Sequence, residues 1–315
     1  MKNICNGGFV SFISTENFKK MVKKERINAF PTPFELVYST FCEHKFDHRD
    51  EDFFLKNTSE YVETMRKYCW QGFENIEKKF TSKMLSSLIS RERIDKMTPY
   101  GAISDFISTY PEHIYNLTLS NTQSRRTRAG NEFEAIIELM MIGANVYADT
   151  QGAIGKSYFQ TNQLGKLVDL VIPGVVFYLS NKRNTMLVSA KTTLRERWQE
   201  VPEEISRTGI REIYLATVDD SISNETINIL YEANVIIVVT KAIKQARFNS
   251  NNKVIVFEEM LQHAKELSKK LHYEDLSSSE LDLLRKSIIK QMHKYDSYPY
   301  VKKHYEKRLA AIPSH

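Results

Sequence analysis

Apolar residues in the middle of the chain gather in short runs with the composition of strands. Residues 165–172 are rich in Leu, Val and Ile, and Pro173-Gly174 ends this run. β-branched and aliphatic residues favour strands, whereas a Pro-Gly pair favours a turn. Two further runs, 175–179 and 185–191, show the same pattern on either side of a polar turn at 181–184. We therefore expect three consecutive strands in this region.

Later in the chain, strand-like runs alternate with segments that have apolar residues at helical spacing. The pattern predicts strands at 212–218, 235–240 and 254–257, and helices at 223–234, 258–271 and 279–292. This alternation indicates an α/β fold with parallel pairing in its second half. The last segment, 295–315, carries tyrosines among lysines. It is interpreted as a surface tail, or as a segment that contacts DNA or a second subunit.

Helical periodicity dominates the first third of the chain. Met65, Cys69, Phe73, Ile76 and Phe80 recur at the spacing of one helix face, in a helix expected to begin near residue 60. The simplest interpretation is that this face of the helix packs in the hydrophobic core. We therefore expect an N-terminal helical subdomain over residues 1–115 and an α/β core over 116–315. A second helix is expected at 129–141, and the polar stretch 149–164 is expected to be a loop.

Three charged residues near the expected strands have the chemistry for phosphodiester hydrolysis. Asp169 lies on the first strand, Lys191 ends the third, and Glu204 follows thirteen residues later. Two carboxylates can hold Mg²⁺, which prefers oxygen ligands. A lysine beside a phosphate can neutralise developing charge or orient the attacking water. Asp and Lys are each common on strands, so a buried strand with a solvated turn is the alternative interpretation.

Two basic segments suit contacts with nucleic acid. The sequence Arg195-Glu196-Arg197 begins four residues after Lys191. Arg donates two hydrogen bonds to guanine and Glu accepts one from cytosine, so this set can read G·C pairs in the major groove. A solvated, self-paired helix face is the alternative. Arg125, Arg126 and Arg128 form a second cluster, interpreted either as phosphate contacts or as a solvated turn.

Composition permits a DNA-binding protein and gives no sign of a secreted or membrane protein. The net charge is +5, which allows a nucleic-acid partner without requiring one. The three cysteines have no paired spacing, which argues against a disulfide framework and suits a reducing cytoplasm. No apolar run approaches the length of a membrane span, so we expect no membrane partner.

The stretch around these residues resembles the SsoII/EcoRII-type restriction endonucleases, in particular the branch that cuts CCNGG. The similarity is carried by Val168-Asp169, by the segment from Ser189 to Trp198 and by Glu204. It implies a PD-(D/E)xK-type core, a mixed β-sheet flanked by helices, whose last acid has moved from the Lys strand to the following helix. Ser189 replaces the usual acid, and the moved acid maps to Glu204, with Glu203 as a neighbour one residue away.

The resemblance also implies roles for four residues outside this stretch. Arg66 and Trp70, four apart on the long helix, correspond to a pair that clamps a flipped-out central base. By themselves they would be interpreted as a surface cation–π pair. Gln123 corresponds to a base-contacting glutamine. Glu134 corresponds to a supporting active-site acid, although the sequence alone would make it an ordinary surface residue of a helix.

The function implied is that of a Mg²⁺-dependent type II restriction endonuclease. It would cut double-stranded DNA at CCNGG before the first C and leave 5′-phosphates. A palindromic half-site calls for a homodimer with two-fold symmetry. Two other classes stay open: a structure-specific repair nuclease or resolvase on the same core, and a DNA-binding protein that does not cleave.

Overall fold

The computed structural model describes residues 13–164, 168–194, 198, 201, 205 and 212–313 of the 315-residue chain. The chain forms two compact units. One consists of Met1–Thr32 and Trp70–Arg128, and the other of Pro33–Cys69 and Ala129–His315. This division differs from the expected boundary after residue 115, because that position lies inside a long helix, α7 (Pro111–Gly143).

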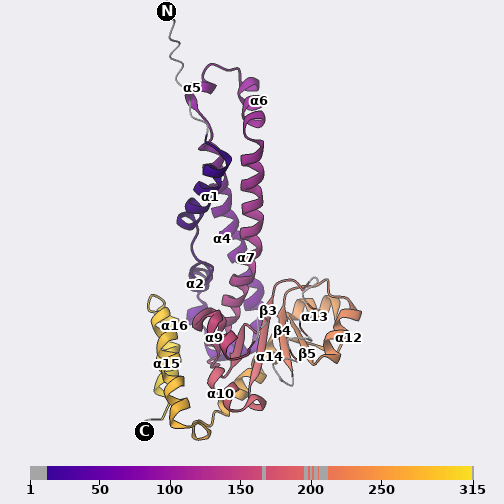
Figure 1. Ribbon diagram of the computed structural model, residues 1–315. Coiled ribbons are helices and arrows are strands. Elements are labelled where there is room, and N and C mark those ends of the chain that lie inside the picture. The colour runs from indigo at the N-terminus through magenta and orange to yellow at the C-terminus, as the bar shows by residue number, and fades with distance from the viewer. Residues whose placement is uncertain are drawn as a thin grey trace, which may run out of the picture. The chain divides into compact units, whose positions relative to one another are not determined.

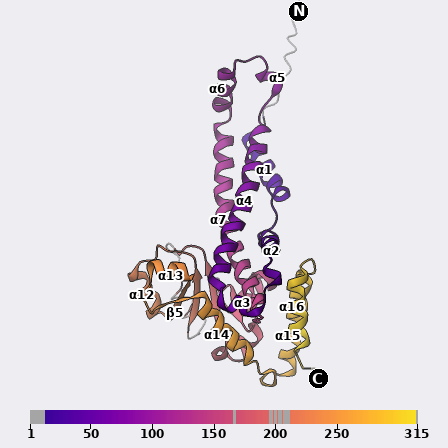
Figure 2. The same ribbon diagram turned by 180° about the vertical axis from the view of Figure 1, so that it is seen from behind.

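The first unit is helical, as expected for the N-terminal part of the chain. It contains α1 (Thr15–Ala29), the part of α4 (Thr58–Ser86) from Trp70 onward, α5 (Arg91–Ile94), α6 (Pro99–Thr109) and the part of α7 up to Arg128. The helices α1, α4 and α7 run side by side in both views (Figures 1 and 2). Their shared core is apolar, and its members are Phe18, Val22, Phe80, Met84, Leu88, Tyr110 and Leu117.

Helix α7 begins at Pro111, eighteen residues before the predicted start at 129. The prediction was wrong because residues 116–128 are polar and were interpreted as a turn. In the structure, one face of this polar stretch is hydrogen bonded to neighbouring helices. Asn121 Nδ2 donates to Thr81 Oγ1 at 2.9 Å, and Arg125 Nε donates to Glu77 Oε2 at 2.7 Å. Hydrogen bonds, together with a few apolar contacts, stabilise this part of the helix.

The second unit is built on a six-stranded mixed sheet. Its strands are β1 (Asp149–Thr150), β2 (Leu170–Ile172), β3 (Met186–Lys191), β4 (Ile213–Thr217), β5 (Val235–Val239) and β6 (Val254–Val256), and they lie in this order. The first three pair antiparallel, and β3 to β6 pair parallel. The expected mixed α/β sheet with parallel pairing in the second half is confirmed.

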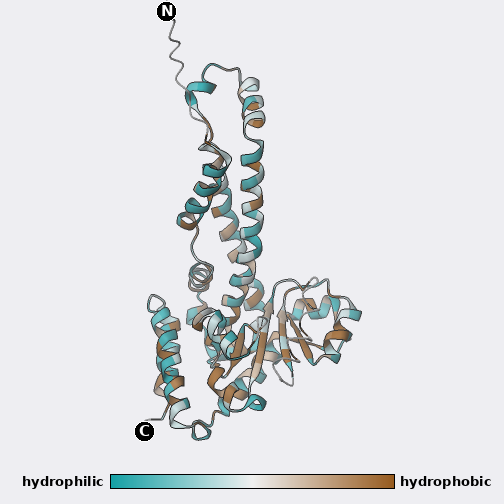
Figure 3. Cartoon of the chain, viewed as in Figure 1, coloured by the Kyte–Doolittle hydropathy of each residue, from teal (hydrophilic) through white to brown (hydrophobic). Residues whose placement is uncertain are grey.

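Successive residues of β3 face opposite sides of the sheet, and each side packs against its own core. Leu187 belongs to a cluster with α12 (Asn224–Glu232), whereas Val188 belongs to a cluster with α7 and α14 (Phe257–Lys269). This alternation is the ordinary period of a strand. Because both faces are covered, β2, β5 and β6 consist only of Leu, Val and Ile, and much of the sheet is brown in Figure 3. Further helices of this unit include α2 (Pro33–Glu43), α3 (Glu51–Lys56), α9 (Lys156–Thr161) and α13 (Lys241–Arg247).

Two expectations for the segments beside the sheet were wrong. The apolar run 175–179, expected to be a strand, is the helix α10 (Val175–Ser180). Periodicity cannot separate strand from helix in a run this short. Here the buried Asp149 Oδ2 accepts the Val175 N–H at 2.8 Å and satisfies one free donor of the first turn. The stretch 149–164, expected to be a loop, contains β1, α8 (Gln151–Ile154) and α9.

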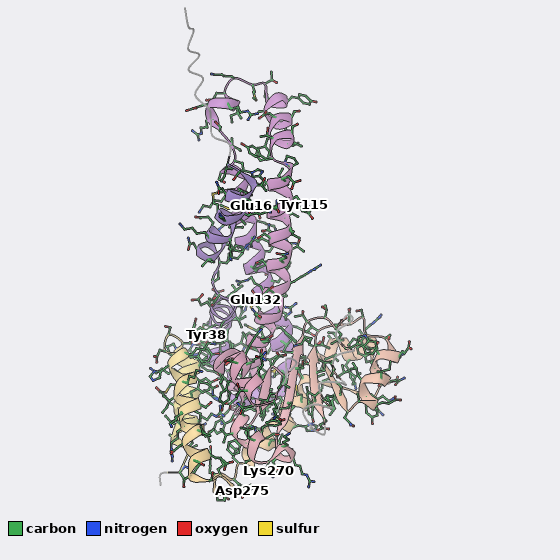
Figure 4. The ribbon with its side chains drawn as sticks, viewed as in Figure 1. Glu16, Tyr38, Tyr115, Glu132, Lys270 and Asp275 are labelled. Atoms are coloured by element: carbon green, nitrogen blue, oxygen red, sulfur yellow. The ribbon has the colours of Figure 1, made fainter. Side chains whose placement is uncertain are left out.

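The C-terminal segment is a packed helix and not a free surface tail. Helix α16 (Pro299–Ala310) packs against α15 (Ser278–Lys294), and Arg308 is almost fully buried. Arg308 Nη1 donates to Asp149 Oδ1 at 2.8 Å, which ties this helix to the first strand. Lys270 and Asp275, labelled in Figure 4, lie in the connection from α14 to α15. No helix in the described part of the chain has the length and apolar character needed to span a bilayer.

Candidate active site

Asp169 and Lys191 lie together where β2 begins and β3 ends. The Asp169 N–H donates to the Val188 carbonyl at 2.9 Å, which holds its backbone against β3. Asp169 Oδ2 accepts from Lys191 Nζ and from the Ala190 N–H, each at 2.7 Å. The Asp169 side chain is 4% exposed and that of Lys191 is 14% exposed. The structure thus brings together the two charges that the sequence placed on separate strands, with the lysine still reachable from solvent.

Glu134 lies on α7, two residues after Glu132, which Figure 4 labels. Burial and the negative charge of Asp169 raise the pKa of Glu134 to about 7, while Lys191 and Lys156 oppose this rise. Burial also raises the pKa of Asp169, against the lowering effect of Lys191. Glu134 is therefore within electrostatic range of the Asp169–Lys191 pair, although the sequence alone made it an ordinary surface residue.

This group of side chains fits a divalent cation. Asp169 raises the pKa of Glu134, and burial raises the pKa of both carboxyls. An added positive charge would stabilise both carboxylates, and their oxygens suit Mg²⁺. Ser189 Oγ, on the same face of β3 as Lys191, is buried and has no hydrogen-bond partner within the described residues. Glu204 and its neighbour Glu203 lie outside the described residues. No group of three or more His, Cys, Asp or Glu with metal-binding geometry occurs among the residues that the structure does describe.

Arg195, Glu196 and Arg197 also lie outside the described residues. The residue just before them is anchored: the Leu194 N–H donates to Asp219 Oδ2 at 2.8 Å. Asp219 follows β4, whose Thr217 pairs with Lys191. The sequence reasoning missed this anchoring acid. The available signal was an acidic residue two positions after a strand that pairs with the Lys191 strand.

Gln151 is a second residue that the sequence reasoning missed. Its N–H donates to the Asp169 carbonyl at 2.8 Å, and its Nε2 donates to the Val168 carbonyl at 3.2 Å. Two hydrogen bonds from one residue therefore fix the backbone that carries the Asp169 carboxylate. Nothing in the local sequence marks Gln151 for this role, because its partner lies eighteen residues away.

In the helical unit, the predicted base-contacting Gln123 is exposed on α7. The basic cluster near it is not uniformly free. Arg125 is paired with Glu77, and Arg128 Nη1 donates to the Pro31 carbonyl at 2.7 Å. Arg126 is exposed on the same helix. Two of the three arginines are therefore engaged within the unit, and the charge of Arg125 is paired with an acid.

Arg66 and Trp70 lie one turn apart on α4, and each has other partners. The Arg66 guanidinium lies 5.9 Å from the centroid of the Phe133 ring, and burial lowers the pKa of Arg66. Trp70 is 42% exposed, and the cation over its ring is Arg125, at 5.9 Å from the centroid. The contact between Arg125 and Trp70 was not predicted from the sequence.

Comparison with known proteins gives concordant matches. The family model described as EcoRII C terminal matches residues 77–261. The chain is 60% identical over 300 residues to the type II restriction enzyme SsoII of Shigella sonnei, with 95% of this chain and 98% of that protein covered. Metal-depleted Ecl18kI in complex with uncleaved DNA is 58% identical, with a TM-score of 0.89 over 95% of this chain and 100% of that one. A complex of restriction endonuclease PspGI with substrate DNA is 16% identical, with a TM-score of 0.55 over 77% of this chain and 95% of that one, and shares the fold.

Proposed function

The chain belongs to the EcoRII C-terminal family and is a type II restriction endonuclease, and we propose that it cuts double-stranded DNA at CCNGG in a Mg²⁺-dependent reaction. The proposed cut lies before the first C of each strand and leaves 5′-phosphates. Family membership sets aside the two other classes, a structure-directed resolvase and a binding protein without cleavage. A restriction enzyme acts on DNA inside the cell, so we also propose a cytoplasmic location.

The observation that carries the catalytic proposal is the 2.7 Å ion pair between Lys191 and Asp169 within range of Glu134. Asp169 and Glu204 would hold the metal ion, with Glu134 in support. When bound, Mg²⁺ polarises the phosphate and lowers the pKa of a coordinated water. Lys191 keeps a reachable ammonium beside Asp169, where it neutralises charge on the phosphate and orients the attacking water.

We assign sequence specificity to side chains that can hydrogen bond to guanine and cytosine. Arg195 and Arg197 would donate to guanine, and Glu196 would accept from cytosine, in the major groove. Gln123, exposed on α7, would contact the outer base pair or the opposite groove. The Ecl18kI and PspGI structures are complexes with DNA, which supports a duplex DNA partner for this chain.

A homodimer follows from the symmetry of the proposed site. CCNGG has two half-sites of two base pairs, and each would be read by one subunit of a two-fold dimer. The odd central pair adds a step of about 3.4 Å between the half-sites. We propose that the central nucleotides are extruded so that the flanking pairs close up. Trp70 would stack on the extruded base, a contact worth about 1–3 kcal/mol, with Arg66 as the second plane. Neither stacking nor a planar cation contacts the hydrogen-bonding edge of the base, so any base would be tolerated at the central position.

A panel of duplexes tests this proposal. Each duplex carries CCNGG or a variant with one outer or inner base pair exchanged, and each is incubated with the protein and Mg²⁺, Ca²⁺ or EDTA. We expect cleavage only of the CCNGG duplexes and only with Mg²⁺. The cleavage rates should be equal for the four central bases. Equal cleavage of the exchanged sites would contradict the readout, and cleavage in EDTA would contradict the metal dependence.

A further inference from the structure

The exposed ring of Trp70 is accompanied by a fixed cation. The Arg125 guanidinium lies 5.9 Å from the ring centroid, within the range of a cation–π contact. Phe73, one turn further along α4, lies against the same ring, with the centroids 5.7 Å apart. All three residues belong to the helical unit, on α4 and α7. A ring that is 42% exposed therefore has two partners that limit its rotation.

Arg125 is itself held by a buried acid. Its Nε donates to Glu77 Oε2 at 2.7 Å, and its Nη2 donates to the same oxygen. The Glu77 side chain is 3% exposed, whereas that of Arg125 is 49% exposed. Two donors on one acceptor fix the orientation of a planar guanidinium, and a buried carboxylate holds its partner more firmly than a solvated one. Glu77 is thus the buried end of this series of contacts, and Arg125 and Trp70 are both partly exposed.

We propose that Arg125, held by Glu77, is a positioning residue that fixes the Trp70 ring for stacking on the extruded central base. This inference rests on the base flipping put forward under the proposed function. Arg66 has a different environment, since its guanidinium lies over Phe133. Among the described residues, the cation over the Trp70 ring is therefore Arg125.

The expected effect follows from the strength of one cation–π contact. An exposed contact of this kind changes an equilibrium by about two- to fivefold. Loss of Arg125 should therefore lower the ratio of stacked to unstacked base by this factor. A side chain that is ordered before binding loses less conformational entropy when the base arrives. Affinity for CCNGG should fall by the same factor relative to affinity for non-specific DNA.

The first measurement needs no DNA. The chain has two tryptophans, so a Trp198→Phe background leaves Trp70 as the only one. Time-resolved anisotropy of Trp70 is compared between Arg125 and Arg125→Ala in that background. We expect a larger amplitude of fast local motion in Arg125→Ala, with part of the order restored in Arg125→Lys, which keeps a cation beside the ring.

The second measurement places 2-aminopurine at the centre of a CCNGG duplex bound in Ca²⁺. With wild-type Trp198 restored, the bound probe should be quenched by Trp70 and brighten in Trp70→Ala. Arg125→Ala should brighten it part of the way. The matched control is Arg126→Ala, which removes the neighbouring exposed charge on the same helix. It should weaken binding to every duplex alike and leave the probe as quenched as in the wild type.

A further variant separates positioning from folding. Arg125→Ala leaves the buried Glu77 carboxylate without its cation, which is destabilising. Glu77→Met/Arg125→Ala removes that unpaired carboxylate and should be more stable than Arg125→Ala, although Arg26 loses the acid that raises its pKa. It should show the same loss of Trp70 order and probe quenching. Unchanged Trp70 anisotropy in this folded double variant overturns the inference, and so does an unchanged probe signal. A different outcome is that the probe fluorescence equals that of free duplex both when bound to the wild type and when bound to Trp70→Ala. In that case no base is flipped, and the flipping proposal fails together with this inference.

Discussion

Replacing Lys191 with Met removes the ammonium and keeps an unbranched side chain of similar length. Asp169 then loses its partner at 2.7 Å and retains the Ala190 N–H, while its side chain is only 4% exposed. Removing one member of a buried pair costs about 3–5 kcal/mol. Because the Lys191 side chain is 14% exposed, we expect the lower end, about 3 kcal/mol, in the metal-free enzyme.

Cleavage should fall for a separate reason, since the lysine stabilises charge that develops on the phosphate. Loss of one such group lowers kcat by about 10²–10³. Binding of CCNGG without metal should stay within about threefold, because Lys191 faces the phosphate and not a base edge. The stability loss and the activity loss therefore have different origins and can be separated.

The assay is a double-mutant cycle with Asp169→Asn and Lys191→Met. Urea unfolding without metal should show that the double variant regains most of the stability lost in Lys191→Met, because no buried carboxylate is left unpaired. The single-turnover cleavage rate should fall by at least about 10² in all three variants. Lys303→Met, which changes an exposed lysine on α16, is the matched control and should alter neither quantity. Cleavage by Lys191→Met within tenfold of the wild type would refute the assigned role.

Three further predictions concern other residues. Glu204→Ala should abolish cleavage while Glu203→Ala retains it, and the reverse result in a plasmid-cleavage assay would move the acid to Glu203. Arg195→Ala or Arg197→Ala should each cost about 1–3 kcal/mol of discrimination between CCNGG and other sequences per lost bidentate contact, and twice that in a dimer. The measurement is competition binding. Equal losses of affinity on CCNGG and on non-specific DNA would show that these arginines are phosphate contacts. Burial and neighbouring cations lower the pKa of His304 to about 3 from 6.5, so the unfolded chain binds a proton below pH 6.5 that the folded chain does not. Stability from this residue is complete above pH 6.5 and falls by about 2–3 kcal/mol by pH 4.5. Unfolding of His304→Gln should lack this part of the acid sensitivity; an unchanged pH profile would show that the histidine is not held neutral.

The sheet was largely predictable because its strands are continuous apolar runs between turn residues. Val235–Val239 follows that pattern throughout, and Met186–Lys191 follows it except at Ser189 and Lys191. The run 175–179 has the same composition, yet it forms α10, where Asp149 from another strand accepts the Val175 N–H. A tertiary hydrogen bond of this kind leaves no trace in the local sequence.

The candidate site was predictable to the extent that its residues lie on neighbouring strands. Asp169 and Lys191 meet because β2 and β3 pair directly, with Leu170 opposite Val188. The pairing of Arg125 with Glu77 could not be predicted in this way. The two residues are on different helices, and Arg125 was interpreted from its local surroundings as a phosphate contact. Its engagement depends on the packing of α7 against α4, which places a buried acid beneath an exposed cation.

The central claim is that Asp169 and Lys191 belong to a site that cuts both strands of CCNGG before the first C. Its most direct test is sequencing of both cut ends from a plasmid with a single CCNGG, incubated with Mg²⁺ and the wild-type enzyme or the folded Asp169→Asn/Lys191→Met variant. We expect the wild type to give 5′-phosphate ends whose overhang spans the whole site, and the variant to give none. Ends at any other position, or the same ends from the variant, would contradict it.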